Sequence, residues 1–236
     1  MLKTNIYPNP ASTAHALIQR ILALLAERPG QPFHMALSGG STPGLLFALW
    51  ASHYRELTPW HQLRFYWVDE RCVPPNHPES NYGMTYKKLL SYVPVKEEQI
   101  FRIRGEMPAE EESRRYAECV AREVPQVDGY PIFDLILLGA GDDGHTSSIF
   151  PDQSHLLTSP LVYAPAVHPQ SGQHRVALTG QPIIRAARIF FLMTGESKRP
   201  ILSALQGTEG SCPAAYIARH ARNRVEVFAD KAVSDD

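Results

Sequence analysis

Two apolar runs do not alternate with polar residues, and they constrain the fold more than any other feature of the sequence. Residues 135–138 read LILL, and residues 189–193 read IFFLM. A strand with one face in water alternates apolar and polar residues, whereas a strand buried on both faces does not. Such runs belong in the middle of a parallel sheet with helices on either side. The pattern therefore predicts an α/β fold built on a mostly parallel sheet.

Helix and strand patterns alternate along the rest of the chain. Asn9 and Pro10 suit the cap and the first turn of a helix, and apolar residues at helical spacing follow as far as Leu25. Further strands are predicted near residues 33–37, 63–68, 133–138, 161–166, 175–178, 189–194 and 225–229. Further helices are predicted after Pro43 and near residues 80–92, 108–123 and 196–206.

Composition and charge exclude several classes of protein. The chain has 236 residues, 44% of them hydrophobic, which is enough for one core, and we expect a single domain over residues 1–236. The net charge is −1 and no basic run is interleaved with aromatics, so neither nucleic acid nor an anionic membrane is an expected partner. Polar residues interrupt the first apolar segment, so no signal peptide is predicted. No apolar run approaches the ~20 residues of a membrane helix.

Cysteine usage favours a reducing compartment. The three cysteines are scattered and form no C-x-x-C pair, which argues against a disulfide framework and against a structural zinc site. We therefore expect a cytoplasmic protein. The histidines of the later loops lack ligand-like spacing, so no metal is expected.

The segment from Phe133 to Pro151, FDLILLGAGDDGHTSSIFP, joins a buried strand to a loop of reactive groups. Its GAGDDG core matches G-x-G-x-x-G, but two aspartates would repel a pyrophosphate and Pro151 comes six residues after His145, leaving no room for a full helix. An imidazole, with an ordinary pKa near ~6.5, suits a general base, and Asp143 can fix its tautomer. The competing reading is a structural histidine that caps a following helix.

Three further polar segments follow predicted strands. The first is a glycine-rich turn that opens a helix and offers free N–H groups, hydroxyls and a helix dipole to an anion. It comprises Ser38, Gly39, Gly40, Ser41 and Thr42. The second carries Asp69, a candidate for proton handling, and Arg71, a candidate for phosphate. The third places Lys198 in a first helical turn, where it can fold over an anion that Arg175 also reaches.

Each of these segments, taken alone, is also typical of an ordinary turn or a solvated surface loop, and for Asp69–Arg71 and Lys198 that reading is the simpler one. Their shared position at the ends of strands favours a different interpretation, because the C-terminal ends of parallel strands meet at one edge of a sheet. Together they predict one pocket with a phosphate end and an acid/base end, which suits a sugar phosphate.

Several motifs resemble those of the 6-phosphogluconolactonase family and occur in the family's order. They are SGGSTP at 38–43, VDERCVP at 68–74 with SNYGM at 80–84, LLGAGDDGHTSSIFP at 137–151, RVALT at 175–179 and TGESK at 194–198. The resemblance implies a Rossmann-like, doubly wound α/β fold with helices on both faces of the sheet. It also implies hydrolysis of 6-phosphoglucono-1,5-lactone to 6-phosphogluconate, in the oxidative pentose phosphate pathway, without a cofactor or a metal.

The resemblance further implies roles for individual residues. His145 matches the family's catalytic histidine, and Asp143 stands at the aspartate of its DGH motif. The implied phosphate-binding positions are Gly39, Gly40, Ser41, Thr42, Arg71 and Lys198. The role of Asp69 stays open, because the corresponding acid of the related deaminases abstracts a proton from the sugar, whereas a hydrolase can use it to bind hydroxyls or water.

Two alternatives stand beside the lactonase. A glucosamine-6-phosphate deaminase would share the scaffold, but its loop after DGH usually runs toward Asn-Glu-Pro, whereas residues 147–151 here read SSIFP. A non-catalytic sugar-phosphate-binding protein would keep the pocket but would have no need of a poised base. For the assembly we expect a monomer.

Overall fold

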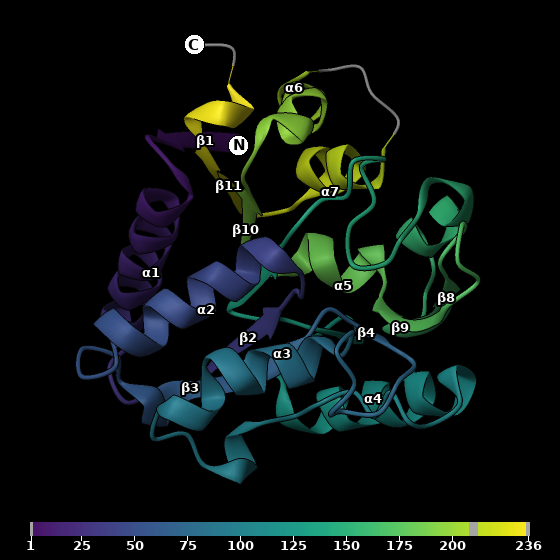
Figure 1. Cartoon of the computed structure of the whole chain (residues 1–236). Coiled ribbons are helices and arrows are strands. Elements are labelled where there is room, and N and C mark those ends of the chain that lie inside the picture. Colours follow the sequence, from purple (N-terminus) through teal and green to yellow (C-terminus); the bar gives the residue numbers. More distant parts are fainter. Residues whose placement is uncertain (1, 208–211, 235–236) are drawn as a thin grey trace.

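A six-stranded parallel sheet forms the centre of the structure (Figure 1). The computed structural model describes residues 2–207 and 212–234. The strand order is β1-β11-β10-β7-β2-β3, and each neighbouring pair runs parallel. The strands are β1 (Leu2–Tyr7), β2 (Phe33–Leu37), β3 (Leu63–Trp67), β7 (Leu135–Leu138), β10 (Arg188–Met193) and β11 (Arg224–Asp230). All four residues of β7 are buried, as its non-alternating sequence predicts.

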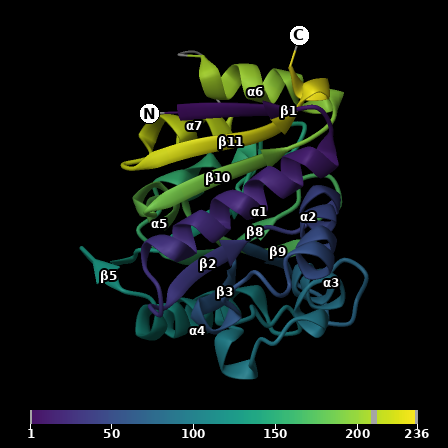
Figure 2. The same ribbon diagram turned by 90° about the vertical axis from the view of Figure 1, so that its left-hand side faces the viewer.

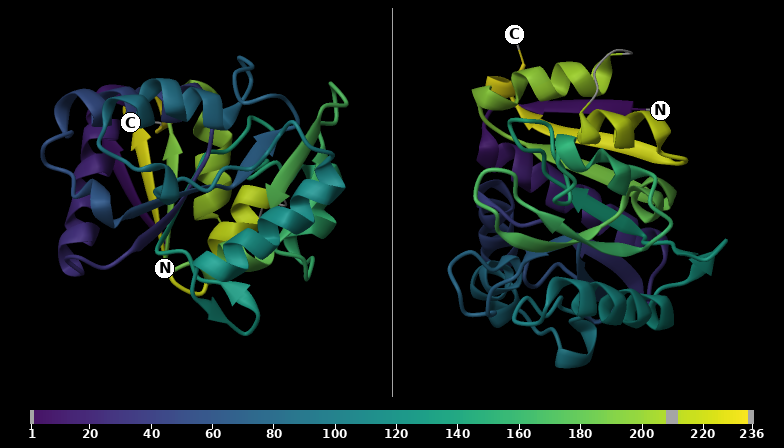
Figure 3. Two further views of the ribbon diagram at one scale, coloured as in Figure 1. Left: turned by 90° about the horizontal axis from the view of Figure 1, so that it is seen from below. Right: turned by 90° about the vertical axis from the view of Figure 1, so that its right-hand side faces the viewer.

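Helices cover both faces of this sheet (Figure 2). On one face lie α1 (Pro10–Glu27) and α2 (Ser41–His53), and α3 (Asn81–Lys88) packs against α2. The opposite face carries α4 (Ala109–Glu123), α5 (Gly180–Arg185) and α7 (Pro213–His220), with α6 (Arg199–Gln206) packed on α7 (Figure 3). This arrangement confirms the predicted α/β fold.

The first helix shows how local sequence sets these elements. The side chain of Asn9 accepts a hydrogen bond from the Ser12 N–H at 2.9 Å, and Pro10 occupies the first turn. Leu17, Ile18 and Ile21 lie at helical spacing and are fully buried against the sheet and α2. Both the cap and the apolar face agree with the prediction from sequence.

A second, antiparallel sheet includes residues 69–71, which were predicted to follow the strand at 63–68 and not to form a strand of their own. These residues make β4 (Asp69–Arg71), which pairs with β9 (His174–Leu178), and β9 pairs in turn with β8 (Tyr163–Val167). A strand of three polar residues carries too few side chains to show a periodic pattern. The pairing sets Arg71 directly opposite Arg175.

The remaining elements are short. A two-stranded hairpin joins β5 (Gln126–Val127) to β6 (Tyr130–Pro131). The 3₁₀ turns are Trp60–Gln62, Leu90–Tyr92, Glu97–Gln99, Pro151–Leu157, Glu196–Lys198 and Lys231–Val233. Within the described residues, none of the helices is both long and apolar enough to cross a bilayer.

The strand order reverses between β2 and β7. From β2 the chain moves outward to β3, and it later returns to β7 on the other side of β2. In open α/β sheets such a switch point leaves a crevice at the carboxyl ends of the strands, and ligands bind there. The loops after β2 and β7 are the glycine-rich turn and the DDGH segment, so the topology places both at this crevice.

Candidate active site

A cavity of ≈ 240 Å³ lies at the switch point. Its walls come from the loops after β2, β7 and β10, from β4 and β9, and from the start of α3. The predicted site residues that line it are Ser38, Gly39, Gly40, Ser41, Thr42, Asp69, Arg71, His145, Arg175 and Lys198. Asp143, also a predicted site residue, does not line the cavity but contacts Nδ1 of the His145 imidazole.

His145 and Asp143 form a hydrogen-bonded pair. The Nδ1 atom of His145 lies 2.6 Å from Asp143 Oδ1, and the same oxygen accepts the His145 backbone N–H at 3.0 Å. Burial raises the pKa of Asp143, but the hydrogen bonds and charge of His145 outweigh it, so this pKa lies below its usual range. An ionised carboxylate at Nδ1 keeps the proton there and leaves Nε2 free to accept another. The pair therefore has the chemistry of an oriented general base.

The loop backbone allows this close approach. A Cβ atom on Gly141 would lie 2.2 Å from His145 Nδ1 and 2.6 Å from Asp143 Oδ1. The other side of the imidazole meets buried Phe150, with ring centroids 4.7 Å apart. No helix begins within residues 139–150, which agrees with the rejection of a dinucleotide-binding turn.

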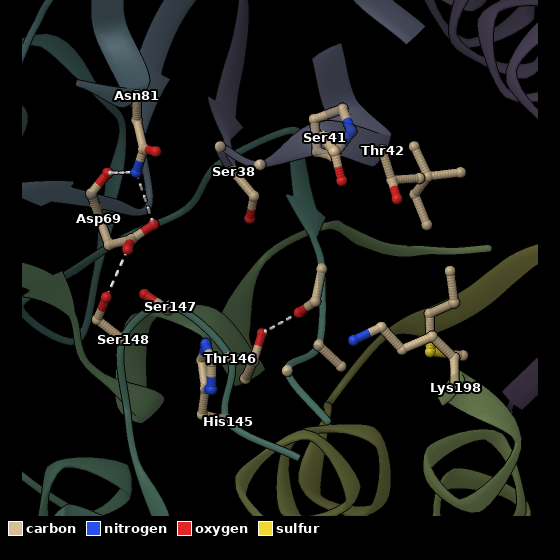
Figure 4. A pocket seen from close by; sticks show the side chains of 18 of the residues that line it. Ser38, Ser41, Thr42, Asp69, Asn81, His145, Thr146, Ser147, Ser148 and Lys198 are labelled. Carbon is tan, nitrogen blue, oxygen red and sulfur yellow. Dashed lines mark hydrogen bonds between the residues drawn. The ribbon is translucent and has the colours of Figure 1, made fainter. Parts of the chain in front are cut away.

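Asp69, Asn81 and Ser148 gather on one side of His145 (Figure 4). Asp69 is buried, and its Oδ2 accepts the Ser148 hydroxyl, while Asn81 Nδ2 lies 2.9 Å from the Asp69 carbonyl oxygen and 3.4 Å from Oδ1. Arg175 Nη1 lies 3.8 Å from Asp69 Oδ2. Burial lowers the pKa of Arg175, although the negative charge of Asp69 acts to raise it. Both oxygens of the Asp69 carboxylate thus have protein donors in reach.

Three buried polar atoms at this side lack a hydrogen-bond partner in the part of the chain that the structure describes. They are Arg71 Nε, Asn81 Oδ1 and Arg175 Nε. Buried polar groups are seldom left unpaired, and those that are tend to occur where a site is strained or functional. Gly39 lets Asn81 come so close, because a Cβ on Gly39 would meet Asn81 Oδ1 at 1.8 Å. We expect this side to bind hydroxyl groups. Arg71 and Arg175, which were predicted to reach the phosphate, therefore lie beside Asp69 and not beside Lys198.

A buried glutamate fixes the position of Asn81. Glu70 accepts the backbone N–H groups of Arg71, Asn81 and Tyr82 at 2.7 to 2.8 Å and the Ser80 hydroxyl at 3.0 Å. These bonds tie β4 to the first turn of α3. The sequence motifs predict no role for Glu70, Asn81 or Ser148. The Ser-Asn pair after the DERCVP motif was the available signal for Asn81.

Lys198, Ser41 and Thr42 lie on the other side of His145 (Figure 4). The Lys198 ammonium group donates to Asp142 Oδ1 at 2.6 Å, and this bond holds the pKa of Asp142 below its usual range. The Oγ1 atoms of Thr42 and Thr194 are 3.0 Å apart. The first N–H groups of α2 begin beside them, after Gly40. Cation, hydroxyls and helix N-terminus together suit a phosphate.

Comparisons with known proteins agree with this geometry. Residues 8–227 match the family of glucosamine-6-phosphate isomerases/6-phosphogluconolactonase. A 6-phosphogluconolactonase of Haemophilus influenzae is 45% identical over 206 residues, 85% of this chain and 86% of that protein. One of Treponema pallidum is 41% identical over 187 residues, 79% and 76% of the two chains.

A crystal structure of the devB protein superposes with a TM-score of 0.93 at 38% identity, covering 99% of this chain and 98% of that one. The sequence matches and the superposition extend over most of the chain, and the family match over residues 8–227 includes every segment that lines the cavity. The chain therefore belongs to the glucosamine-6-phosphate isomerase/6-phosphogluconolactonase family.

Proposed function

We propose that this protein hydrolyses 6-phosphoglucono-1,5-lactone to 6-phosphogluconate. The observation that supports this proposal most strongly is the His145–Asp143 pair, in which Nδ1 and Oδ1 are 2.6 Å apart. The imidazole lines a cavity that has an anion-binding side and a hydroxyl-binding side. The relatives named above are 6-phosphogluconolactonases, which supports the same substrate here. A cytoplasmic location, a monomeric state and the absence of a cofactor stay predictions from sequence.

The mechanism needs little beyond an oriented base, because a δ-lactone is already an activated ester. His145 Nε2 takes a proton from a water molecule, and the water oxygen attacks C1 of the lactone. As the C1–ring oxygen bond breaks, the imidazolium returns the proton to the ring oxygen. Asp143 keeps the imidazole in the tautomer that can accept this proton.

Asp69 serves in this proposal as a hydroxyl acceptor. Its carboxylate already accepts from Ser148 and lies within reach of Asn81 and Arg175, so it is fixed in place. A fixed, hydrogen-bonded carboxylate suits the recognition of sugar hydroxyls.

The deciding experiment follows lactone opening and ammonia release by the same purified protein. We expect fast opening of 6-phosphoglucono-1,5-lactone above the spontaneous rate, and no ammonia from glucosamine 6-phosphate. Ammonia release without lactone turnover would favour the deaminase. Tight binding of 6-phosphogluconate without either reaction would favour a sugar-phosphate-binding protein.

Asp142 competes with the substrate for Lys198. The substitution Asp142→Asn should lower KM for the phosphorylated lactone about 2- to 5-fold and leave kcat unchanged, since an exposed ion pair contributes up to ~1 kcal/mol. Steady-state kinetics measure this shift. Glu196→Gln removes the same charge from an exposed residue outside the cavity and should change neither constant. An unchanged or higher KM in Asp142→Asn would contradict the competition.

A further inference from the structure

A tight turn directly after His145 has an unusual backbone. Ser147 and Ser148 have positive φ values of 53° and 54°, and the Ile149 N–H donates to the Thr146 carbonyl at 2.8 Å. Two left-handed residues closed by this bond make a type I′ turn. All of residues 146–148 line the cavity, and none is more than 5% exposed.

The chain contains an ordinary turn of the same kind for comparison. In the β5–β6 hairpin, Asp128 and Gly129 have φ values of 52° and 77°, and Asp-Gly is a preferred sequence there. Among the described residues, Asp128, Ser147 and Ser148 are the non-glycine residues with positive φ. Each such residue costs about 1–3 kcal/mol, and strain of this kind concentrates at functional sites.

Side-chain hydrogen bonds hold the strained turn in place. The Ser147 hydroxyl lies 2.8 Å from the Val68 carbonyl and 2.9 Å from the Leu178 carbonyl, where β3 and β9 end. The Ser148 hydroxyl donates to Asp69, and the Thr146 hydroxyl donates to the Gly139 carbonyl at 2.8 Å. Glycine would relieve the strain but would lose these anchors, which accounts for serine at both positions.

Two backbone amides of the turn are available to bind a ligand. The N–H groups of Ser147 and Ser148 make no hydrogen bond within the described structure, although both residues are buried. A type I′ turn is the mirror image of one helical turn, so its two central N–H groups point to the same side, as at the start of a helix. Unpaired buried N–H groups are rare, and a pair of them beside a base suits an anion.

We propose that the Ser147 and Ser148 N–H groups form the oxyanion hole for lactone opening, an inference that rests on the proposed function. When the water oxygen bonds to C1, the π electrons of the carbonyl move to its oxygen, and the two amides stabilise this negative charge. When the C=O bond re-forms, the C1–ring oxygen bond breaks and His145 protonates the ring oxygen. The base and the donors lie within residues 145–148, so one loop positions both.

An amide-to-ester replacement tests the backbone donor directly. We compare Ser148→Gly with the same protein carrying glycolic acid at position 148, which differs only by an oxygen in place of the N–H. Glycine tolerates positive φ, so neither protein carries backbone strain at position 148, and both lack the Ser148 hydroxyl to the same extent. We expect the ester to lower kcat for the phosphorylated lactone at least about 10-fold relative to Ser148→Gly, with KM within about twofold.

We expect the same decrease in kcat at position 147, when Ser147→Gly is compared with the same protein carrying glycolic acid at position 147. As a structural control, the α-hydroxy analogue of isoleucine at position 149 removes the N–H that closes the turn, and it should lower the thermal unfolding midpoint more than the ester at 148 does. Equal kcat values in the ester and glycine proteins at both positions would overturn the oxyanion hole. A wild-type protein without lactone turnover would instead overturn the proposed function, so the two failures are distinguishable.

Discussion

Replacing His145 with alanine is expected to lower kcat for the phosphorylated lactone about 10²- to 10⁴-fold, which is the usual contribution of a positioned acid or base. KM should change by less than about threefold, because the imidazole acts on water and not on the phosphate. The reason is geometric: Asp143 orients the ring and Gly141 lets the pair sit close to the loop backbone, so no other base is held at the same place. Initial rates with the spontaneous opening subtracted measure the effect.

The control for this variant is His155→Ala, because His155 is exposed and does not line the cavity. It should keep kcat within about twofold of the wild type. A His145→Ala protein with a wild-type melting temperature and near wild-type kcat would show that another group takes the proton. Circular dichroism shows whether the His145→Ala protein is folded, and therefore whether a loss of activity reflects the missing base or a loss of folding.

The central sheet could be predicted because its signal lies in short segments of sequence. The run at 135–138 is apolar at each position, and burial on both faces of β7 is the physical reason. The predicted bounds 33–37 equal those of β2. By contrast, β1 was not predicted, since this edge strand mixes exposed and half-buried residues and carries no run of apolar ones. The short helices α5 and α7 were also missed, because six to eight residues give a weak helical period.

The convergence of the site could be predicted from topology alone, since parallel strands end at one edge. The finer contacts could not. Asn81 reaches Asp69 only because Glu70 anchors the start of α3, and Ser148 reaches it only through a left-handed turn. Nothing in local sequence marks Ser-Ser as a type I′ turn, which normally contains glycine or asparagine. Likewise, the pairing of Asp142 with Lys198 joins residues 56 apart in sequence.

Lys198→Ala is expected to raise KM for the phosphorylated lactone about 10- to 100-fold, in line with the loss of a hydrogen bond to a charged group. Lys198 is the cation on the side of the cavity where Thr42 and the first N–H groups of α2 also lie. Its side chain is only 21% exposed, so water screens its charge less than that of a surface lysine. With unphosphorylated gluconolactone the same variant should keep kcat/KM within about twofold, because that substrate offers no phosphate to the ammonium group.

Two further variants make this result specific. Lys231→Ala removes an exposed lysine outside the cavity and should change KM for neither substrate. Arg175→Ala removes the cation beside Asp69, on the hydroxyl-binding side. It should weaken the binding of both lactones to a similar degree. The opposite result would be that Arg175→Ala lowers kcat/KM for the phosphorylated lactone alone, while Lys198→Ala lowers kcat/KM for both lactones equally. In that case the phosphate would bind beside Asp69, and the sugar would lie in the cavity in the reverse direction. The ratio of the two kcat/KM values, phosphorylated over unphosphorylated, therefore reports the orientation of the substrate across His145.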